Sequence, residues 1–113
     1  MLKTDIDHIK NLNMKPNIKY AFSYLKGVTV LDLSRIIVGP YATMMLSDFG
    51  ARVIKVEHFL GDETRRWGPP FKGDFSCYFL SINRNKESLT LNLKTPESSE
   101  IINRLVEKSD VVV

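Results

Sequence analysis

The sequence predicts an α/β fold built on a parallel sheet, and three patterns support this prediction. Short β-branched and apolar runs occur at residues 28–33 and 52–57. Such runs are typical of strands that are buried on both faces of a parallel sheet. A segment with apolar residues at helical spacing lies between them. Together they have the length of a strand–helix–strand unit, in which a right-handed crossover joins two parallel strands.

The first predicted strand covers residues 28–33 and ends near Ser34. After a short loop, Pro40 suits the first turn of a helix because its fixed φ is close to the helical value. Apolar residues then recur at helical spacing as far as Phe49. Gly50 is the type of residue that most often follows a last helical turn. We therefore expect a helix from Pro40 to about Gly50.

Residues 58–87 form a long connection in which glycine and proline are frequent and only residues 75–82 have a regular pattern. Long connections in compact domains are often functional. The segment 61–71 mixes acids, bases and an aromatic residue, which is typical of a solvated loop or of one that docks on a ligand. Residues 83–86 offer amide and cationic donors suited to phosphate oxygens, although such a turn is usually just exposed.

The second half of the chain predicts a strand, a helix and another strand. Leucine alternates with polar residues through 88–94, which indicates a half-buried strand. Thr95 is placed to cap the next helix, with Pro96 at its first position. Residues 111–113 then indicate a buried strand. Because such a strand normally continues into a covering element, we interpret the sequence as a fragment.

We divide the chain into an irregular leader, residues 1–26, and a domain fragment, residues 27–113. The leader is rich in Lys and Asn, lacks Arg, and contains Asp5 and Asp7. This departs from the Arg-rich, acid-poor composition of a transit peptide. The composition therefore does not decide between a mitochondrial and a cytoplasmic location.

Composition excludes several classes of partner and site. The 16 basic and 13 acidic residues are interleaved, and the net charge is only +3. We therefore expect no nucleic-acid partner. No apolar stretch approaches the roughly 20 residues that cross a bilayer, so no membrane partner is expected. Cys77 is the only cysteine, which excludes an internal disulfide and a Cys-rich metal site. We interpret it as a core thiol and expect no bound metal.

The candidate binding surface is the carboxyl edge of the predicted sheet, where ligands bind in open α/β folds. Polar and glycine residues follow the strands at 34–39, 58–66 and 94–95. Gly39 before Pro40 would permit close approach of an anion to the helix start, or would simply serve a tight turn.

A dinucleotide-binding site is an alternative, because Glu57 ends the second strand where a ribose-binding acid would fall. The GxGxxG motif is absent, however. The usual pyrophosphate cradle therefore cannot form, and we expect Glu57 to be a structural, hydrogen-bonding residue.

Four blocks of the sequence, in this order and spacing, resemble the start of the family III CoA transferases. They are LDLSRIIVGPYATMMLSDFGARVIKVE, GDETRRWGPPF, SINRNKESLTLNLKTPE and SDVVV. The resemblance runs from Gly27 to Val113. The second block looks most like the succinyl-CoA–glutarate, or dicarboxylate, branch of the family.

The resemblance implies that the chain is the N-terminal part of a Rossmann-like large domain. It implies an enzyme that moves CoA between an acyl-CoA, such as succinyl-CoA, and a carboxylic acid, such as glutarate. The acyl-CoA is a substrate and no cofactor is bound permanently. An aspartate beyond this segment would form the anhydride intermediate. The fragment alone, with no catalytic residue, is expected to be inactive, and the full-length protein to be an interlocked homodimer.

The resemblance also implies which residues contact CoA. They are Ile37, Val38, His58, Leu91, Asn92, Leu93 and Lys94. Backbone groups at the strand ends would bind adenine or pantetheine, and Lys94 would meet a phosphate. The family commonly has arginine at the position of His58, so a permanent cation is replaced by a type of side chain that is mostly neutral near pH 7.

Two other functions fit the same resemblance. One is an acyl-CoA racemase of the same fold. The other is a catalytically inactive module that binds CoA or another nucleotide.

Overall fold

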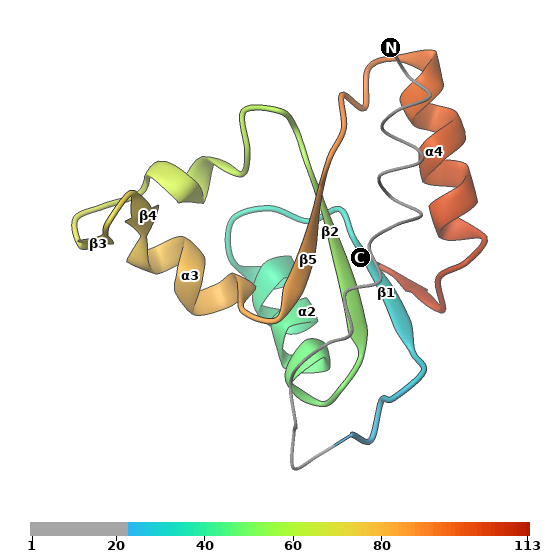
Figure 1. The fold of residues 1–113 in the computed structure, drawn as a ribbon, viewed down its shortest axis with the longest axis horizontal. Helices are drawn as coiled ribbons and strands as arrows, with labels where there is room; N and C mark the ends of the chain where they lie inside the picture. Colours follow the sequence, from blue (N-terminus) through green and yellow to red (C-terminus); the bar gives the residue numbers. More distant parts are fainter. Residues whose placement is uncertain (1–22) are drawn as a thin grey trace.

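A computed structural model describes residues 23–113 and shows a parallel four-stranded sheet with helices on both faces (Figure 1). The predicted leader, residues 1–26, falls almost wholly outside the described residues. The sheet has the order β5-β2-β1-β6, and every neighbouring pair is parallel. Its strands are β1 (Thr29–Asp32), β2 (Arg52–Glu57), β5 (Lys86–Thr90) and β6 (Val111–Val112). The predicted α/β fold with a Rossmann-like parallel sheet is confirmed.

Within residues 23–113, three α-helices cover the sheet. They are α2 (Val38–Asp48), α3 (Cys77–Asn83) and α4 (Pro96–Val106). Figure 1 shows α4 on one side of the strands and α2 with α3 on the other. The chain moves outward from β1 to β2 and β5 but returns across the sheet to β6. A right-handed crossover in the reverse direction places its helix on the opposite face. The strand order therefore reverses next to β1, which is where open α/β sheets bind ligands.

The long connection between β2 and α3 contains more regular structure than its sequence indicates. It includes the 3₁₀ helix η1 (Glu63–Arg66) and a separate antiparallel pair, β3 (Phe71–Lys72) and β4 (Phe75–Ser76). In Figure 1 this pair lies at the edge of the view, away from the main sheet. Ser76 begins α3, because its hydroxyl accepts a hydrogen bond from the backbone N–H of Phe79.

One face of the sheet is apolar at its centre. Leu31, Ile54 and Val56 are buried there, and Ile102 and Leu105 of α4 pack against them. Consecutive side chains of a strand point to opposite faces. Val53, Lys55 and Glu57 of β2 therefore face α2 and α3.

The strand predicted over 88–94 is wrong at its end, because β5 stops at Thr90. Leu91 still packs against the apolar face, but Leu93 is exposed. The cause is a turn at Asn92, whose side-chain oxygen accepts from the N–H of Lys94 and whose carbonyl accepts from the N–H of Thr95.

Other local predictions had mixed outcomes. Strand β2 matches its predicted range, and Gly50 follows α2 with the left-handed φ of +100° expected of a residue beyond the last turn. Thr95 is the N-cap residue of α4, but its hydroxyl bonds to Asn92 and Ser98 and caps no helical N–H. Cys77 is half-buried at the start of α3, so its predicted place in the core is wrong.

Candidate functional site

The predicted CoA contacts follow β1, β2 and β5: Val38 is the first residue of α2, and the others lie in the loops after these strands. Among them Leu91 and Asn92 are half-buried, while Ile37, Val38, His58, Leu93 and Lys94 are exposed. The N–H of Leu91 donates to the carbonyl of Glu57 over 2.8 Å. This bond places His58 beside the segment 91–94. Ile37 and Val38 lie one strand further along the same edge, since β1 pairs with β2.

The loop after β1 has a constrained backbone. Ile36 has φ +72°, a left-handed conformation that is an outlier for a β-branched residue and costs on the order of 1–3 kcal/mol. A Cβ at Gly39 would overlap the side chain of Ser34. Gly39 is therefore explained by close packing between the start of α2 and this loop, which was the simpler of its two interpretations.

The carboxyl half of the sheet face under α2 and α3 holds three ion pairs, which we call the charge network. Their N–O distances are 3.0 Å for Lys86–Asp32, 3.1 Å for Lys55–Asp62 and 2.7 Å for Arg65–Glu57. Five of the six side chains are at most 3% exposed, and only Arg65, at 33%, reaches solvent. Burial of isolated charges is costly, so such groups must be paired and hydrogen-bonded.

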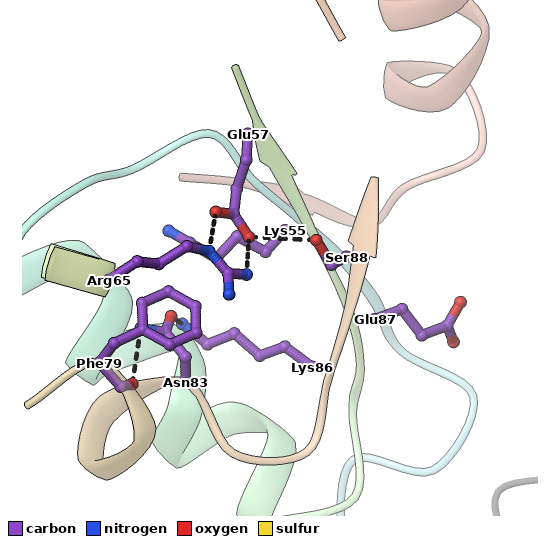
Figure 2. Close-up of a pocket in the computed structure, with 8 residues that line it drawn as sticks. All are labelled: Lys55, Glu57, Arg65, Phe79, Asn83, Lys86, Glu87 and Ser88. Carbon is purple, nitrogen blue, oxygen red and sulfur yellow. Dashed lines mark hydrogen bonds and ion pairs between the residues drawn. The ribbon is translucent and has the colours of Figure 1, made fainter. Parts of the chain in front are cut away.

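Glu57 is the most heavily bonded member of the charge network. The Nε and Nη2 atoms of Arg65 each donate to one carboxylate oxygen over 2.7 Å. The N–H of Asp62 and the hydroxyl of Ser88 donate to the same carboxylate over 2.8 and 3.1 Å. Figure 2 shows the Arg65 fork and Ser88 converging on Glu57. The guanidinium also lies 3.8 Å from the centroid of the Phe79 ring. The expectation that Glu57 is a structural, hydrogen-bonding residue is confirmed.

Asp62 and Lys55 attach the start of η1 to the sheet. One carboxylate oxygen of Asp62 accepts from the N–H and hydroxyl of Thr64. The other lies 3.1 Å from Lys55 Nζ but receives no well-aligned hydrogen bond. Lys55 also donates to the carbonyl of Ser34 over 2.9 Å. The segment 61–66 is therefore anchored at its buried positions and is not a simple solvated loop.

Lys86 points into the protein, which corrects the prediction that residues 83–86 offer donors to a phosphate. Its ammonium donates to Asp32, to the carbonyl of Pro40 and to Asn83, over 3.0, 2.8 and 2.8 Å. The neighbouring Arg84 and Asn85 side chains bind Asp48 of α2. These donors are used to join α2, α3 and β5.

The charge network favours ionised carboxylates. Burial alone raises the pKa of Asp32, but hydrogen bonds from Ser34, Thr43 and Lys86 outweigh it, so the pKa falls below its ordinary value. The pKa of Glu57 also falls, since Arg65 and the N–H of Asp62 outweigh burial. For Asp62, hydrogen bonds from Thr64 and the nearby ammonium group of Lys55 outweigh burial in the same way, so its pKa is also lowered. Burial lowers the pKa of Lys86, and Asp32 offsets only part of this.

A small cavity of about 70 Å³ lies within the charge network, between Arg65, Phe79 and Lys86 (Figure 2). Ligand pockets usually have several hundred Å³, so this volume suits a few water molecules. It is not a place for CoA. The charge network itself was missed from the sequence. Lys55 and Glu57, at alternate positions of an otherwise apolar strand, were the available signal of a charged stripe on one face.

Within the described part of the chain, no group of three or more metal-ligating side chains could hold an ion. No helix there is long and apolar enough to span a bilayer.

Comparison with known proteins gives consistent matches. The family model for CoA-transferase family III matches residues 25–113. Over 90 residues the chain is 54% identical to succinyl-CoA:glutarate CoA-transferase of Homo sapiens. It is 45% identical over 96 residues to succinate–glutarate CoA-transferase of Agrobacterium fabrum. A crystal structure of a CAIB/BAIF family protein from Brucella suis matches 80% of the chain with a TM-score of 0.75 and 44% identity.

These matches cover most of this chain but only part of each relative. The human and Agrobacterium matches cover 79% of this chain and 20% and 24% of those proteins, and the Brucella match covers 25% of that chain. The chain thus spans about a fifth to a quarter of the length of these relatives. Since the family model covers well over half of its residues, the chain belongs to CoA-transferase family III.

Proposed function

We propose that this chain is the N-terminal segment of a CoA transferase that moves CoA between succinyl-CoA and a dicarboxylic acid such as glutarate. The observation that carries the proposal is the 54% identity to a succinyl-CoA:glutarate CoA-transferase over 90 residues. Relatives that use mesaconate as their named substrate are also similar, at 49% identity. These acids are dicarboxylates, so the dicarboxylate class is the shared feature.

The segment would supply the edge of the sheet that holds CoA. The loop at Ile37 and Val38 and the turn from Leu91 to Lys94 offer main-chain groups to adenine and pantetheine. Lys94 is exposed at this edge and is suited to a phosphate. His58 lies between these two segments. CoA enters as part of the substrate, and no resident cofactor is required.

The chemistry would depend on an aspartate outside this chain, which attacks the thioester and forms an acyl-enzyme anhydride. Three aspartates of this segment have other roles. Asp32 and Asp62 are buried in ion pairs, and Asp110 accepts a hydrogen bond from the N–H of Thr29. A buried, paired carboxylate cannot reach a thioester. We expect the longer protein to be an interlocked homodimer.

Transfer of CoA from succinyl-CoA to glutarate tests the proposal. The 113-residue chain alone should show none. A chimera in which residues 25–113 replace the matching segment of the human relative should be active. Activity of the chain alone would show that it carries a nucleophile. A folded chimera that transfers no CoA, beside an active human parent, would contradict the proposed role of the segment.

His58→Arg in the same chimera tests the contact to CoA. Arginine remains charged at any working pH and can bind phosphate through two N–H groups, whereas histidine side chains generally lose their charge above about pH 7. We expect CoA to bind roughly tenfold more tightly at pH 8, with a smaller gain at pH 6. If the chimera and its His58→Arg variant bind CoA with equal affinity at both pH values, His58 does not contact CoA.

A further inference from the structure

We propose that Glu57 is a positioning residue that fixes the spacing between the His58 loop, residues 58–61, and the turn at Leu91–Lys94. Arg65 holds Glu57 in place. The inference rests on the proposed function, because it assigns these two segments to the nucleotide end of CoA. It makes Glu57 responsible for affinity toward CoA and leaves the acyl-transfer step to other residues.

The first observation is that Glu57 bonds to both segments at once. Its main-chain carbonyl accepts the N–H of Leu91 over 2.8 Å, at the start of the 91–94 turn, and this bond does not depend on the side chain. Its carboxylate accepts the N–H of Asp62 over 2.8 Å, directly after the His58 loop. Ser88 of β5 donates to the same carboxylate. The carboxylate therefore joins the end of the His58 loop to β5, the strand that leads into the turn at Leu91–Lys94.

The second observation is that the His58 loop is closed tightly around this carboxylate. The N–H of Gly61 donates to the carbonyl of His58 over 2.7 Å. Gly61 has φ +75°, and a Cβ there would lie 2.7 Å from Cδ of Arg65. The guanidinium of Arg65 is in turn held by the Phe79 ring and by both oxygens of Glu57. The backbone of the His58 loop is therefore held by hydrogen bonds of Gly61 and Asp62 and by close packing against Arg65.

The third observation is a contrast within the same two strands. Arg52 and Glu87 form a second two-bond pair across β2 and β5, over 2.8 and 2.9 Å. That pair lies at the opposite end of β2 and is 60% and 47% exposed. An exposed ion pair such as Arg52–Glu87 can thus link β2 to β5 at little desolvation cost. Burial of Glu57 has a desolvation cost that the exposed pair avoids, and what distinguishes the Glu57 carboxylate is that it bonds both to Asp62, after the His58 loop, and to Ser88 of β5.

The test compares Glu57→Gln with the matched control Glu87→Gln in the active chimera. Each change converts the carboxylate of an Arg–Glu fork into an amide. We expect Glu57→Gln to raise the KM for succinyl-CoA roughly tenfold, because charge-assisted bonds that set the loop are lost. It should leave kcat within about twofold. It should also leave the KM for succinyl-pantetheine, which lacks the nucleotide, unchanged. Glu87→Gln should change none of these values.

The outcomes separate this inference from the proposed function. An unsubstituted chimera that is inactive contradicts the proposed function. An active chimera whose Glu57→Gln variant keeps its KM for succinyl-CoA overturns the inference, as does an equal rise for succinyl-pantetheine.

If Glu57→Gln prevents folding of the chimera, Arg65→Lys decides, since lysine keeps the charge but cannot bond both oxygens in fork geometry. It should produce the same selective rise in KM. In the 113-residue chain, amide hydrogen exchange at Asp62, whose N–H donates to the Glu57 carboxylate, should accelerate with Glu57→Gln and not with Glu87→Gln. Unchanged exchange at the Asp62 amide would overturn the inference independently of activity.

Discussion

The two faces of the sheet differ in kind, and β2 shows the difference within six residues. Ile54 and Val56 enter an apolar core under α4. Lys55 and Glu57 enter the charge network on the opposite face. Burial of apolar groups stabilises a fold directly, whereas the attraction within a buried ion pair roughly offsets the cost of desolvation. Apolar packing under α4, together with that of Val30 and Val53 against Leu46 of α2, therefore accounts for stability, and the charge network accounts for the geometry of the loops at the carboxyl edge.

The largest effect should come from breaking one ion pair on the charged face. Lys55→Met leaves the 1% exposed carboxylate of Asp62 without its cation. This should lower the free energy of unfolding by about 3–5 kcal/mol. Urea unfolding of the 113-residue chain, in trimethylamine N-oxide to extend the folded baseline, measures it.

A second variant shows whether the lost charge is the cause. Lys55→Met with Asp62→Asn removes both charges but keeps an oxygen that accepts from Thr64. It should recover most of the loss. If the double variant is no more stable than Lys55→Met, uncompensated charge is not the reason for the instability.

On the apolar face, Leu31→Ala should cost about 2–5 kcal/mol, because Leu31 is fully buried and its removal leaves a cavity against α4. Leu93→Ala is the control, since Leu93 is 51% exposed, and it should change the urea midpoint little. Similar midpoints for the two variants would mean that the packing under α4 contributes no stability.

Acid should weaken the charged face selectively. The lowered pKa values of Asp32, Glu57 and Asp62 mean that folding favours their ionised forms. Their contribution is complete above the ordinary carboxyl pKa near 4 and is lost as the pH falls through the lower folded-state values. The free energy of unfolding should therefore fall between about pH 5 and pH 2. For the variant Lys55→Met with Asp62→Asn, the free energy of unfolding should decrease less steeply over the same pH range. If the free energy of unfolding of this variant depends on pH as it does in the parent chain, Asp62 does not contribute to the loss of stability in acid.

The smallest effect is expected for the exposed pair. Glu87→Gln should change the free energy of unfolding by less than about 1 kcal/mol, because solvent screens the Arg52–Glu87 interaction. Raising the salt concentration should shrink even this difference. A loss of stability as large as that of Lys55→Met would show that solvent exposure does not determine how much an ion pair contributes to stability in this fold.

Local patterns predicted the fold better than the site. The apolar run at 52–57 coincides with β2, and Pro96 begins α4 as expected. The end of β5 was missed because leucine alternation continues into the turn at Asn92, where side-chain and main-chain bonds override it.

The charge network was missed for a different reason. Its partners are distant in the sequence: Lys86 and Asp32 are 54 positions apart, and Ser88 and Glu57 are 31 apart. No periodicity in one sequence pairs such residues. Only the fold brings them together, at the face that β1, β2 and β5 share.

The place of β6 beside β1 has a consequence for the order of folding. Asp110 accepts the N–H of Thr29 from a position 81 residues away. Closing a flexible loop of that length costs roughly 4 kcal/mol in chain entropy, more than the shorter closures that pair β1 with β2 and β2 with β5. We expect β5, β2 and β1 to assemble first and β6 to dock last. Until it docks, the backbone edge of β1 at Val30 and Leu31 is open, and this is where the folding chain is most exposed to pairing with another molecule.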